Sequence, residues 1–189
     1  MTKAQLRKQY LQERIQIPTK ERLRLDDLML LQFQQFDYSE VATVFTYWPM
    51  AHTAEPNTHL FNGYLRHVIP GLQFCYPVCN MDNLCMQAIG IDEDTVYRSN
   101  EYGIMQPKTG AVIPPKQIDL VLVPLIVADA RGYRVGYGKG FYDKFLCECR
   151  KDVVTFGFSY FEPVAKIADI AAFDIPLNFL ITPNLVHEF

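Results

Sequence analysis

Residues 118–145 read IDLVLVPLIVADARGYRVGYGKGFYDKF, a pattern that changes from apolar to glycine-rich to helical. The run at 118–127 is almost continuously apolar, which is typical of a strand covered on both faces of a sheet. A short helix is expected from about Phe141 to Arg150. The glycine-rich loop therefore follows a buried strand, and in α/β sheets ligands bind beyond the carboxyl ends of such strands.

Strand and helix patterns alternate along the rest of the chain. Helices are expected at 3–16, from Thr19 to Leu31 and at 60–68, and strands at 41–48, 72–78, 84–91, 153–160 and 177–182. No repeat, low-complexity tract or linker divides the 189 residues, so we expect one domain spanning residues 1–189. The alternation predicts an α/β fold in which a sheet lies between helical layers.

The composition argues against several classes of protein. A formal net charge of -3 gives no cationic field, so we expect neither nucleic acid nor an anionic membrane as a partner. The charged start of the chain and the lack of a long apolar run predict no signal peptide and no membrane span. The five cysteines form no CxxC pair, which predicts reduced thiols and a cytoplasmic location.

Gly136, Gly138 and Gly140 alternate with other residues in the loop. Because glycine lacks a Cβ atom, this spacing lets a ligand approach the backbone closely and lets several N–H groups point toward one anion. The helix expected from Phe141 directs its N-terminal dipole into the same space. A purely structural turn is the alternative.

Charged side chains around the glycines favour a phosphate ligand. Arg134 and Lys139 add fixed positive charge, whereas Asp143 falls in the first turn of the helix. A carboxylate there repels a polyphosphate unless a hard cation such as Mg²⁺ lies between them. The sequence therefore predicts a nucleoside triphosphate bound with Mg²⁺. Asp129, at the end of the strand, is either a turn-former or a site residue.

The loop is part of a longer pattern of motifs. The strand DLVLVP at 119–124 is followed by Asp129 and by GYRVGYGKGFYD at 132–143. KAQLR at 3–7, EPNT at 55–58, GIMQP at 103–107 and a late Asp174 accompany it. Together these segments resemble the 5-formyltetrahydrofolate cyclo-ligase family, also called methenyltetrahydrofolate synthetases.

The resemblance implies an enzyme and a fold. The reaction is ATP-dependent closure of 5-formyltetrahydrofolate to 5,10-methenyltetrahydrofolate, with release of ADP and phosphate and with Mg²⁺ as the metal. The fold is a three-layer α/β sandwich with a mostly parallel central sheet, related to sugar-phosphate isomerases and CoA transferases. Because the reacting atoms belong to the substrates, such a protein positions groups and neutralises charge. We expect a monomer.

The resemblance also implies roles for single residues. Mg²⁺ is assigned to Asp143 and Asp174, and the folate ring to Glu55 and Asn57, with Tyr137 and Tyr142 beside it. ATP is assigned to Lys3, Arg7, Arg134, Gly136, Tyr137, Gly138, Lys139, Gly140, Phe141 and Tyr142. Lys139 and Arg134 are the expected catalytic residues. Lys139 is expected to stabilise the negative charge that develops on the γ-phosphoryl oxygens.

Some positions depart from the family pattern, and two other functions stay open. Gln106 stands where Glu is usual, Phe173 where a His precedes the late Asp, and 125–128 where the family has a G-L-a-F stretch. One alternative is a non-catalytic sensor of phosphorylated metabolites, which needs the glycine loop but not both Asp143 and Asp174. The other is a kinase or ATPase that acts on another small molecule.

The first helix carries Lys3, Arg7 and Arg14 on one face. Like charges at this spacing mildly destabilise an isolated helix, so we expect the stability without ligand to stay unchanged or rise when Lys3 and Arg7 are removed. The alternative to ATP contact is a solvated basic face. For Glu55 the alternative is an ordinary solvated loop charge, and for Tyr137 it is core packing.

Overall fold

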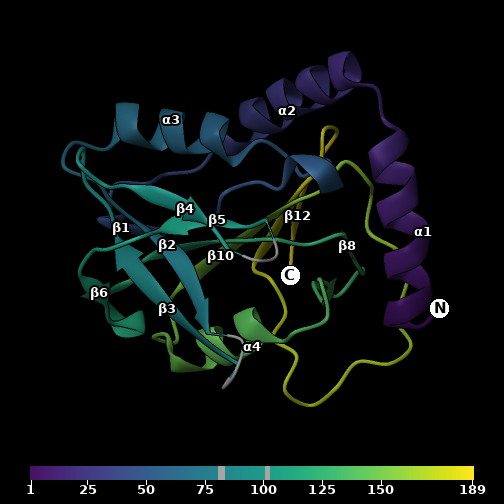
Figure 1. Cartoon of the computed structure of the whole chain (residues 1–189). Helices are drawn as coiled ribbons and strands as arrows, with labels where there is room; N and C mark the ends of the chain where they lie inside the picture. The colour runs from purple at the N-terminus through teal and green to yellow at the C-terminus, as the bar shows by residue number, and fades with distance from the viewer. Residues whose placement is uncertain (81–83, 101–102) are drawn as a thin grey trace.

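The structure is a computed structural model that describes residues 1–80, 84–100 and 103–189 (Figure 1). Its helices are α1 (Lys3–Gln16), α2 (Thr19–Phe33), α3 (Thr58–Val68) and α4 (Phe141–Glu148), with 3₁₀ turns η1 (Ala51–Thr53) and η2 (Pro115–Gln117). The strands are β1 (Thr43–Phe45), β2 (Gln73–Asn80), β3 (Cys85–Gly90), β4 (Tyr97–Ser99), β5 (Met105–Pro107), β6 (Val112–Ile113), β7 (Leu120–Val123), β8 (Val127–Ala128), β9 (Arg134–Val135), β10 (Val154–Phe158), β11 (Phe179–Ile181) and β12 (Val186–Glu188). None of the helices in the described ranges has the length and apolar character needed to cross a membrane.

The described residues form one eight-stranded sheet with the order β12-β11-β10-β7-β1-β2-β3-β6. Its inner strands β11, β10, β7, β1 and β2 pair in parallel. At one edge of the sheet, β12 pairs antiparallel with β11. At the other edge, β3 pairs antiparallel with β2, and β6 pairs antiparallel with β3. The prediction of a mostly parallel central sheet is therefore confirmed.

Helices cover both faces of this sheet, so the fold has three layers (Figure 1). On one face, Phe61 of α3 stacks on Phe158 of β10 with ring centroids 3.9 Å apart. On the other face, Phe145 of α4 packs on Phe45 of β1 with centroids 4.6 Å apart. The central strand β7 is buried along its whole length, as expected of a strand with helices on both sides.

The apolar run at 118–127 is not the single strand that we predicted. β7 ends at Val123, and after Pro124 the chain leaves the sheet. Proline has no N–H to donate to a ladder, so a central strand ends where it occurs. The following β8 pairs with β9 in a separate antiparallel hairpin, and the glycine loop follows directly.

The hairpin β8–β9 connects the glycine loop to α1. Leu6 of α1 is buried in one cluster with Val127 and Val135 of the hairpin. Asp129 organises the turn between the two strands, because its buried carboxylate accepts hydrogen bonds from the backbone N–H groups of Arg131, Tyr133 and Ile167. Asp129 is therefore a turn-former. The hairpin whose turn it stabilises packs against α1.

Candidate active site

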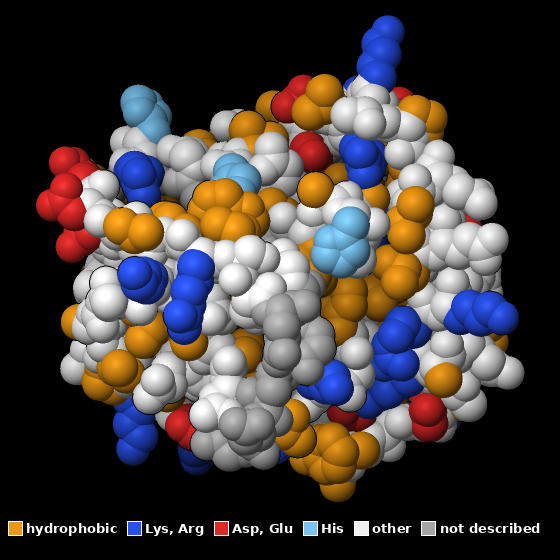
Figure 2. Space-filling model, in the orientation of Figure 1, with side chains coloured by type: hydrophobic (Ala, Val, Ile, Leu, Met, Phe, Trp, Pro, Cys, Tyr) orange, Lys and Arg blue, Asp and Glu red, His pale blue; other side chains and the backbone are white. Residues whose placement is uncertain are grey.

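A cleft of about 820 Å³ opens beside the glycine loop. Figure 2 shows this face hollowed right of centre, with hydrophobic side chains inside the hollow and Lys or Arg side chains along its lower edge. Every residue to which a site role was assigned lines the cleft, with the exception of Asn57. They are Lys3, Arg7, Glu55, Arg134, Gly136, Tyr137, Gly138, Lys139, Gly140, Phe141, Tyr142, Asp143 and Asp174.

Arg7 ties α1 to the glycine loop. Its Nε donates to the carbonyl oxygen of Gly136 at 2.7 Å. Its guanidinium also lies where a side chain at Gly138 would project, 3.4 Å from the position of the missing Cβ atom. Gly138 and Gly140 have φ of +91° and +71°, a region that favours glycine. The loop therefore needs glycine at 138 both for its backbone shape and for the approach of Arg7.

Lys3 and Asp174 form an ion pair across the mouth of the cleft. Lys3 Nζ lies 2.5 Å from Asp174 Oδ2, which also accepts the backbone N–H of Ala171 at 2.6 Å. The two residues are 171 positions apart in the chain. Because Arg7 has an acceptor in the loop and Lys3 has one in Asp174, the basic face of α1 is packed against other parts of the protein rather than solvated.

Arg134 and Asp143 form a second pair on the floor of the cleft. One terminal nitrogen of Arg134 donates a hydrogen bond to Asp143 Oδ1 at 2.8 Å, and the other donates to the carbonyl oxygen of Ile175 at 2.6 Å. Burial lowers the pKa of the Arg134 guanidinium, whereas the carboxylates of Asp143 and Asp174 raise it. Both carboxylates therefore interact electrostatically with the same buried cation. This attraction stabilises two negative charges close to the glycine loop.

The donor set formed by Asp143 and Asp174 in the cleft lining suits a magnesium ion held jointly with a polyphosphate. Asp143 Oδ2 and Asp174 Oδ1 accept no hydrogen bond from the residues that the structure describes. The described residues contain no group of three or more metal-ligating side chains. Mg²⁺ is commonly bound through one or two carboxylates together with substrate phosphates and water, so two carboxylates are sufficient.

Glu55 also lines the cleft and is only 8% exposed, so the alternative of a solvated loop charge is wrong. Its Oε2 accepts the backbone N–H of Met50 at 2.6 Å, and its Oε1 accepts the hydroxyl of Tyr137. Burial raises the pKa of the Glu55 carboxyl, while these hydrogen bonds and the nearby Arg14 lower it. Both oxygens of the carboxylate are thus held in place at the cleft wall.

Comparison with known proteins decides the family. The model of the 5-formyltetrahydrofolate cyclo-ligase family matches residues 1–172. The chain belongs to this family. The resemblance drawn from the motifs is therefore confirmed, together with the enzyme class and the fold that it implied.

Relatives and solved structures of the cyclo-ligase family cover the chain. The cyclo-ligase of Mycoplasma pneumoniae is 28% identical over 184 residues, which are 96% of this chain and 98% of the relative. The match to the Haemophilus influenzae cyclo-ligase, at 32% identity over 87 residues, spans 44% of this chain and 46% of the relative. The NMR structure of the Aquifex aeolicus 5,10-methenyltetrahydrofolate synthetase has a TM-score of 0.81 at 26% identity and covers 100% of this chain and 93% of that one. The M. pneumoniae synthetase structure has a TM-score of 0.75 at 26% identity and covers 97% and 99%.

Asn57, expected to contact the folate, and Gln106 and Phe173, which depart from the cyclo-ligase pattern, lie in different places. Asn57 does not line the cleft, because its side chain caps α3 by accepting the N–H of His59 at 3.2 Å. Gln106 is buried in β5, also away from the cleft lining. Phe173 lines the cleft next to Asp174 and is 68% exposed. Asn57 is therefore a helix cap in this structure, and its contact with the folate stays a prediction.

The sequence reasoning missed two features of the site. The sequence placed Arg14 on the basic face of α1 but did not predict that it is buried. Only 1% of Arg14 is exposed. An apolar wall was also missed, because its residues are scattered along the chain and carry no motif. The wall consists of Tyr47, Trp48, Met50, Pro77, Cys79, Met86 and Ile104.

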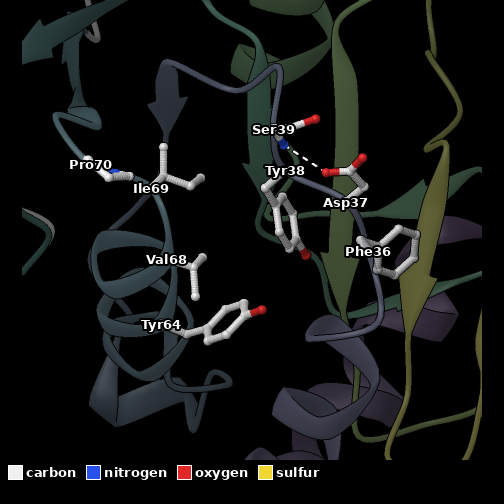
Figure 3. A pocket seen from close by; sticks show the side chains of 8 residues that line it. All are labelled: Phe36, Asp37, Tyr38, Ser39, Tyr64, Val68, Ile69 and Pro70. Atoms are coloured by element: carbon white, nitrogen blue, oxygen red, sulfur yellow. Dashed lines mark hydrogen bonds between the residues drawn. The ribbon is translucent and has the colours of Figure 1, made fainter.

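A second cavity, of about 330 Å³, lies between the end of α3 and the segment after α2 (Figure 3). Its lining is aromatic and aliphatic, and Asp37 is the charged residue among the described ones. The Asp37 carboxylate accepts the N–H of Ser39 at 2.9 Å. Without a cation in its lining, this cavity does not suit a phosphate ligand.

Proposed function

We propose that the large cleft binds ATP and 5-formyltetrahydrofolate together and closes the folate ring to give 5,10-methenyltetrahydrofolate, ADP and phosphate. The family to which the chain belongs carries this activity in its name. The observation that supports the proposal most is that one cleft is lined both by the glycine loop with cations and carboxylates and by a buried glutamate with apolar side chains. Such an arrangement suits a polyphosphate next to a flat, partly apolar ring system.

The phosphate end is formed by the glycine loop and α1. Lys3, Arg7 and Lys139 supply positive charge, and the N-terminus of α4 opens toward the loop at Gly140. Lys139 is exposed and has neither an ion-pair nor a hydrogen-bond partner among the described residues. It is therefore available to meet the negative charge that develops on the transferred phosphoryl group.

Asp143 and Asp174 are proposed to hold Mg²⁺, which neutralises phosphate charge when it is bound. Arg134 lies against Asp143 in the structure, so we propose that its main contribution is to position that carboxylate. A contact between Arg134 and ATP, expected from the sequence, stays a prediction. As ATP binds, the Lys3 ammonium group contacts a phosphate oxygen, and its ion pair with Asp174 weakens.

The folate end is formed by Glu55, Tyr137 and the apolar wall. The carboxylate of Glu55 is proposed to accept N–H donors of the pterin ring, since both its oxygens retain lone pairs beyond the contacts that hold it. Trp48 and Met50 supply apolar surface for the ring. Tyr142 lines the same space with a hydroxyl that has no partner among the described residues.

The chemistry follows from the amide character of the N-formyl group, whose carbon is a poor electrophile. The formyl oxygen attacks the γ-phosphorus of ATP in line, and ADP leaves. N10 of the folate then attacks the activated carbon and loses its proton, and the C–O bond breaks so that inorganic phosphate leaves with the former formyl oxygen as the ring closes. The protein holds the two substrates in line and supplies Lys139, which is why a nucleophilic side chain is not needed.

The test is a mass balance with the purified protein, Mg-ATP and 5-formyltetrahydrofolate. ADP, phosphate and 5,10-methenyltetrahydrofolate should form in equal amounts, and only when all substrates are present. A kinase would transfer phosphate without forming the methenyl product, and a sensor would bind without forming ADP. Asp37→Asn, in the separate cavity of Figure 3, is the matched control and should turn over normally. The cytoplasmic location, the monomeric state and the lack of a nucleic-acid partner stay predictions.

A further inference from the structure

Arg14 is a buried cation without a direct carboxylate partner among the described residues. Its Nε donates to the carbonyl oxygen of Thr53 and one terminal nitrogen to that of Leu125, both at 2.8 Å. The other terminal nitrogen donates to the Tyr137 hydroxyl oxygen at 2.7 Å. Burying an unpaired charge costs several kcal/mol, so this arrangement needs a compensating negative charge nearby.

That charge is Glu55, reached through Tyr137. A guanidinium only donates, and the Thr53 hydroxyl makes a longer contact of 3.3 Å with the Tyr137 oxygen, so the single hydroxyl proton of Tyr137 is directed to Glu55 Oε1. The second oxygen of Glu55 already accepts the N–H of Met50. A proton on either oxygen would remove the negative charge that strengthens both bonds and that compensates Arg14, so the chain of contacts from Arg14 favours the ionised carboxylate.

We propose that Arg14 is a positioning residue for folate, which holds the Tyr137 hydroxyl and keeps Glu55 as the anionic acceptor that the N–H donors of the pterin ring need. This inference rests on the proposed function, because it assigns folate to the Glu55 end of the cleft. Arg14 does not line the cleft and acts through Tyr137.

Other titratable groups around Glu55 do not replace Arg14. The groups that interact with its carboxylate are Arg14 of α1, His52 of η1, Tyr47 after β1, Tyr137 of the loop and Tyr142 of α4. The tyrosines are neutral donors whose pKa values burial raises, and an imidazole is not a permanent cation as a guanidinium is. Arg14 is therefore the permanent cation in this set.

The experiment measures folate binding directly, through the fluorescence of Trp48, the single tryptophan of the chain and part of the cleft wall. 5-Formyltetrahydrofolate is titrated without ATP from about pH 5 to about pH 9, and KM values for both substrates are measured in parallel. Arg14→Met should weaken folate binding about tenfold or more at neutral pH. It should also move the acid limb of the binding curve up by about one pH unit or more, while the KM for ATP changes little.

Two further variants keep the test decisive. Arg14→Lys retains the charge and should leave the acid limb near its wild-type position, although one ammonium cannot hold all three acceptors. Tyr137→Phe removes the hydroxyl that links Arg14 to Glu55, while Arg14 keeps its bonds to both carbonyl oxygens. This variant therefore tests the proposal even if Arg14→Met does not fold. It should move the acid limb in the same direction. Arg24→Met, on the exposed side of α2, is the control and should bind folate normally.

The outcomes separate the two proposals. A wild-type protein that binds no folate contradicts the proposed function itself. A wild-type protein that binds folate, with Arg14→Met and Tyr137→Phe variants of unchanged folate affinity and pH dependence, overturns the role of Arg14 alone. A rise in the KM for ATP as large as that for folate also overturns it, because it indicates a general disturbance of α1.

Discussion

The Arg134 guanidinium lies 2.8 Å from the Asp143 carboxylate, with the glycine loop connecting the two residues along the chain. Their side chains are only 5% and 18% exposed, so each charge depends on the other. Asp143 Oδ1 is occupied by this pair and by the N–H of Ile175. One carboxylate therefore neutralises the buried arginine through one oxygen and has the second oxygen for a metal ion.

Two substitutions separate these roles of Asp143. Asp143→Asn keeps an oxygen that can accept from Arg134 but loses the charge that Mg²⁺ needs, so activity should fall about 10- to 100-fold or more while the protein stays folded. Asp143→Ala leaves the buried Arg134 without its carboxylate partner and should lower the free energy of unfolding by about 3–5 kcal/mol. Turnover at limiting Mg²⁺ and urea unfolding are the measurements. Near wild-type turnover of Asp143→Asn at limiting Mg²⁺ would show that Asp143 is not a metal ligand.

Replacing both Lys3 and Arg7 by Ala should weaken ATP binding by about 2–5 kcal/mol, the usual range for truncating a buried charge pair. The contacts to Asp174 and Gly136 also reverse our expectation for the protein without ligand. Removing these bonds should lower the free energy of unfolding by about 1 kcal/mol. ATP titration calorimetry and thermal melting measure the two effects, with Lys8→Ala, an exposed lysine of the same helix, as the control. Unaltered ATP affinity would return α1 to a structural role.

Gly138→Ala should destabilise the protein without any ligand. The backbone φ of +91° is strained for alanine, and the new methyl group lies against the Arg7 guanidinium. We expect a loss of about 1–3 kcal/mol in urea unfolding. Gly136→Ala is the matched control for stability, because nothing lies within 4 Å of its added Cβ atom and its φ is not positive. Equal losses in the two variants would argue against this account of the loop.

Glu55→Ala should raise the KM for 5-formyltetrahydrofolate about 10- to 100-fold and change the KM for ATP far less. The pterin donors would then lie unpaired in a closed site, which costs about 1–3 kcal/mol. Steady-state kinetics with each substrate varied in turn measures the two constants. Equal effects on both KM values would place Glu55 outside the pterin pocket.

Asp26 predicts a pH-dependent stability. Its carboxylate in α2 accepts the hydroxyl of Tyr160 at 2.9 Å and the N–H of Asn57 at 3.3 Å, and burial raises its pKa from 3.8 to about 6. Because the folded state holds the proton more tightly, this group's stabilising contribution is full below about pH 4 and is lost as the pH rises through about 6. Asp26→Asn should therefore be more stable than wild type at neutral pH, by up to about 3 kcal/mol, and the gain should vanish in acid.

Urea unfolding at about pH 4 and about pH 7 measures this difference. Asp27→Asn, an exposed neighbour on α2, is the control and should show little change at either pH. A gain for Asp26→Asn that is the same at both pH values would contradict the raised pKa.

Local sequence was sufficient for the strand, the loop and the helix at 118–145. Apolar continuity, glycine spacing and the start of α4 are properties of neighbouring residues, so they can be recognised without knowing the fold. The departure came at Pro124, where a proline inside an apolar run ended β7. Pro124 is visible in the sequence, but the apolar residues on both sides of it led us to predict one continuous strand.

The sequence by itself determined the family, the mostly parallel sheet and which residue types gather at the loop. Only the tertiary structure decided how their charges pair. Lys3 finds Asp174 across 171 positions, and Arg14 reaches Glu55 through a tyrosine from a third segment. Helical spacing fixed the face of α1 that carries Lys3 and Arg14, but not whether that face meets water or protein. That choice depends on long-range packing against the β8–β9 hairpin, since a cation is buried only where the rest of the fold supplies its acceptors.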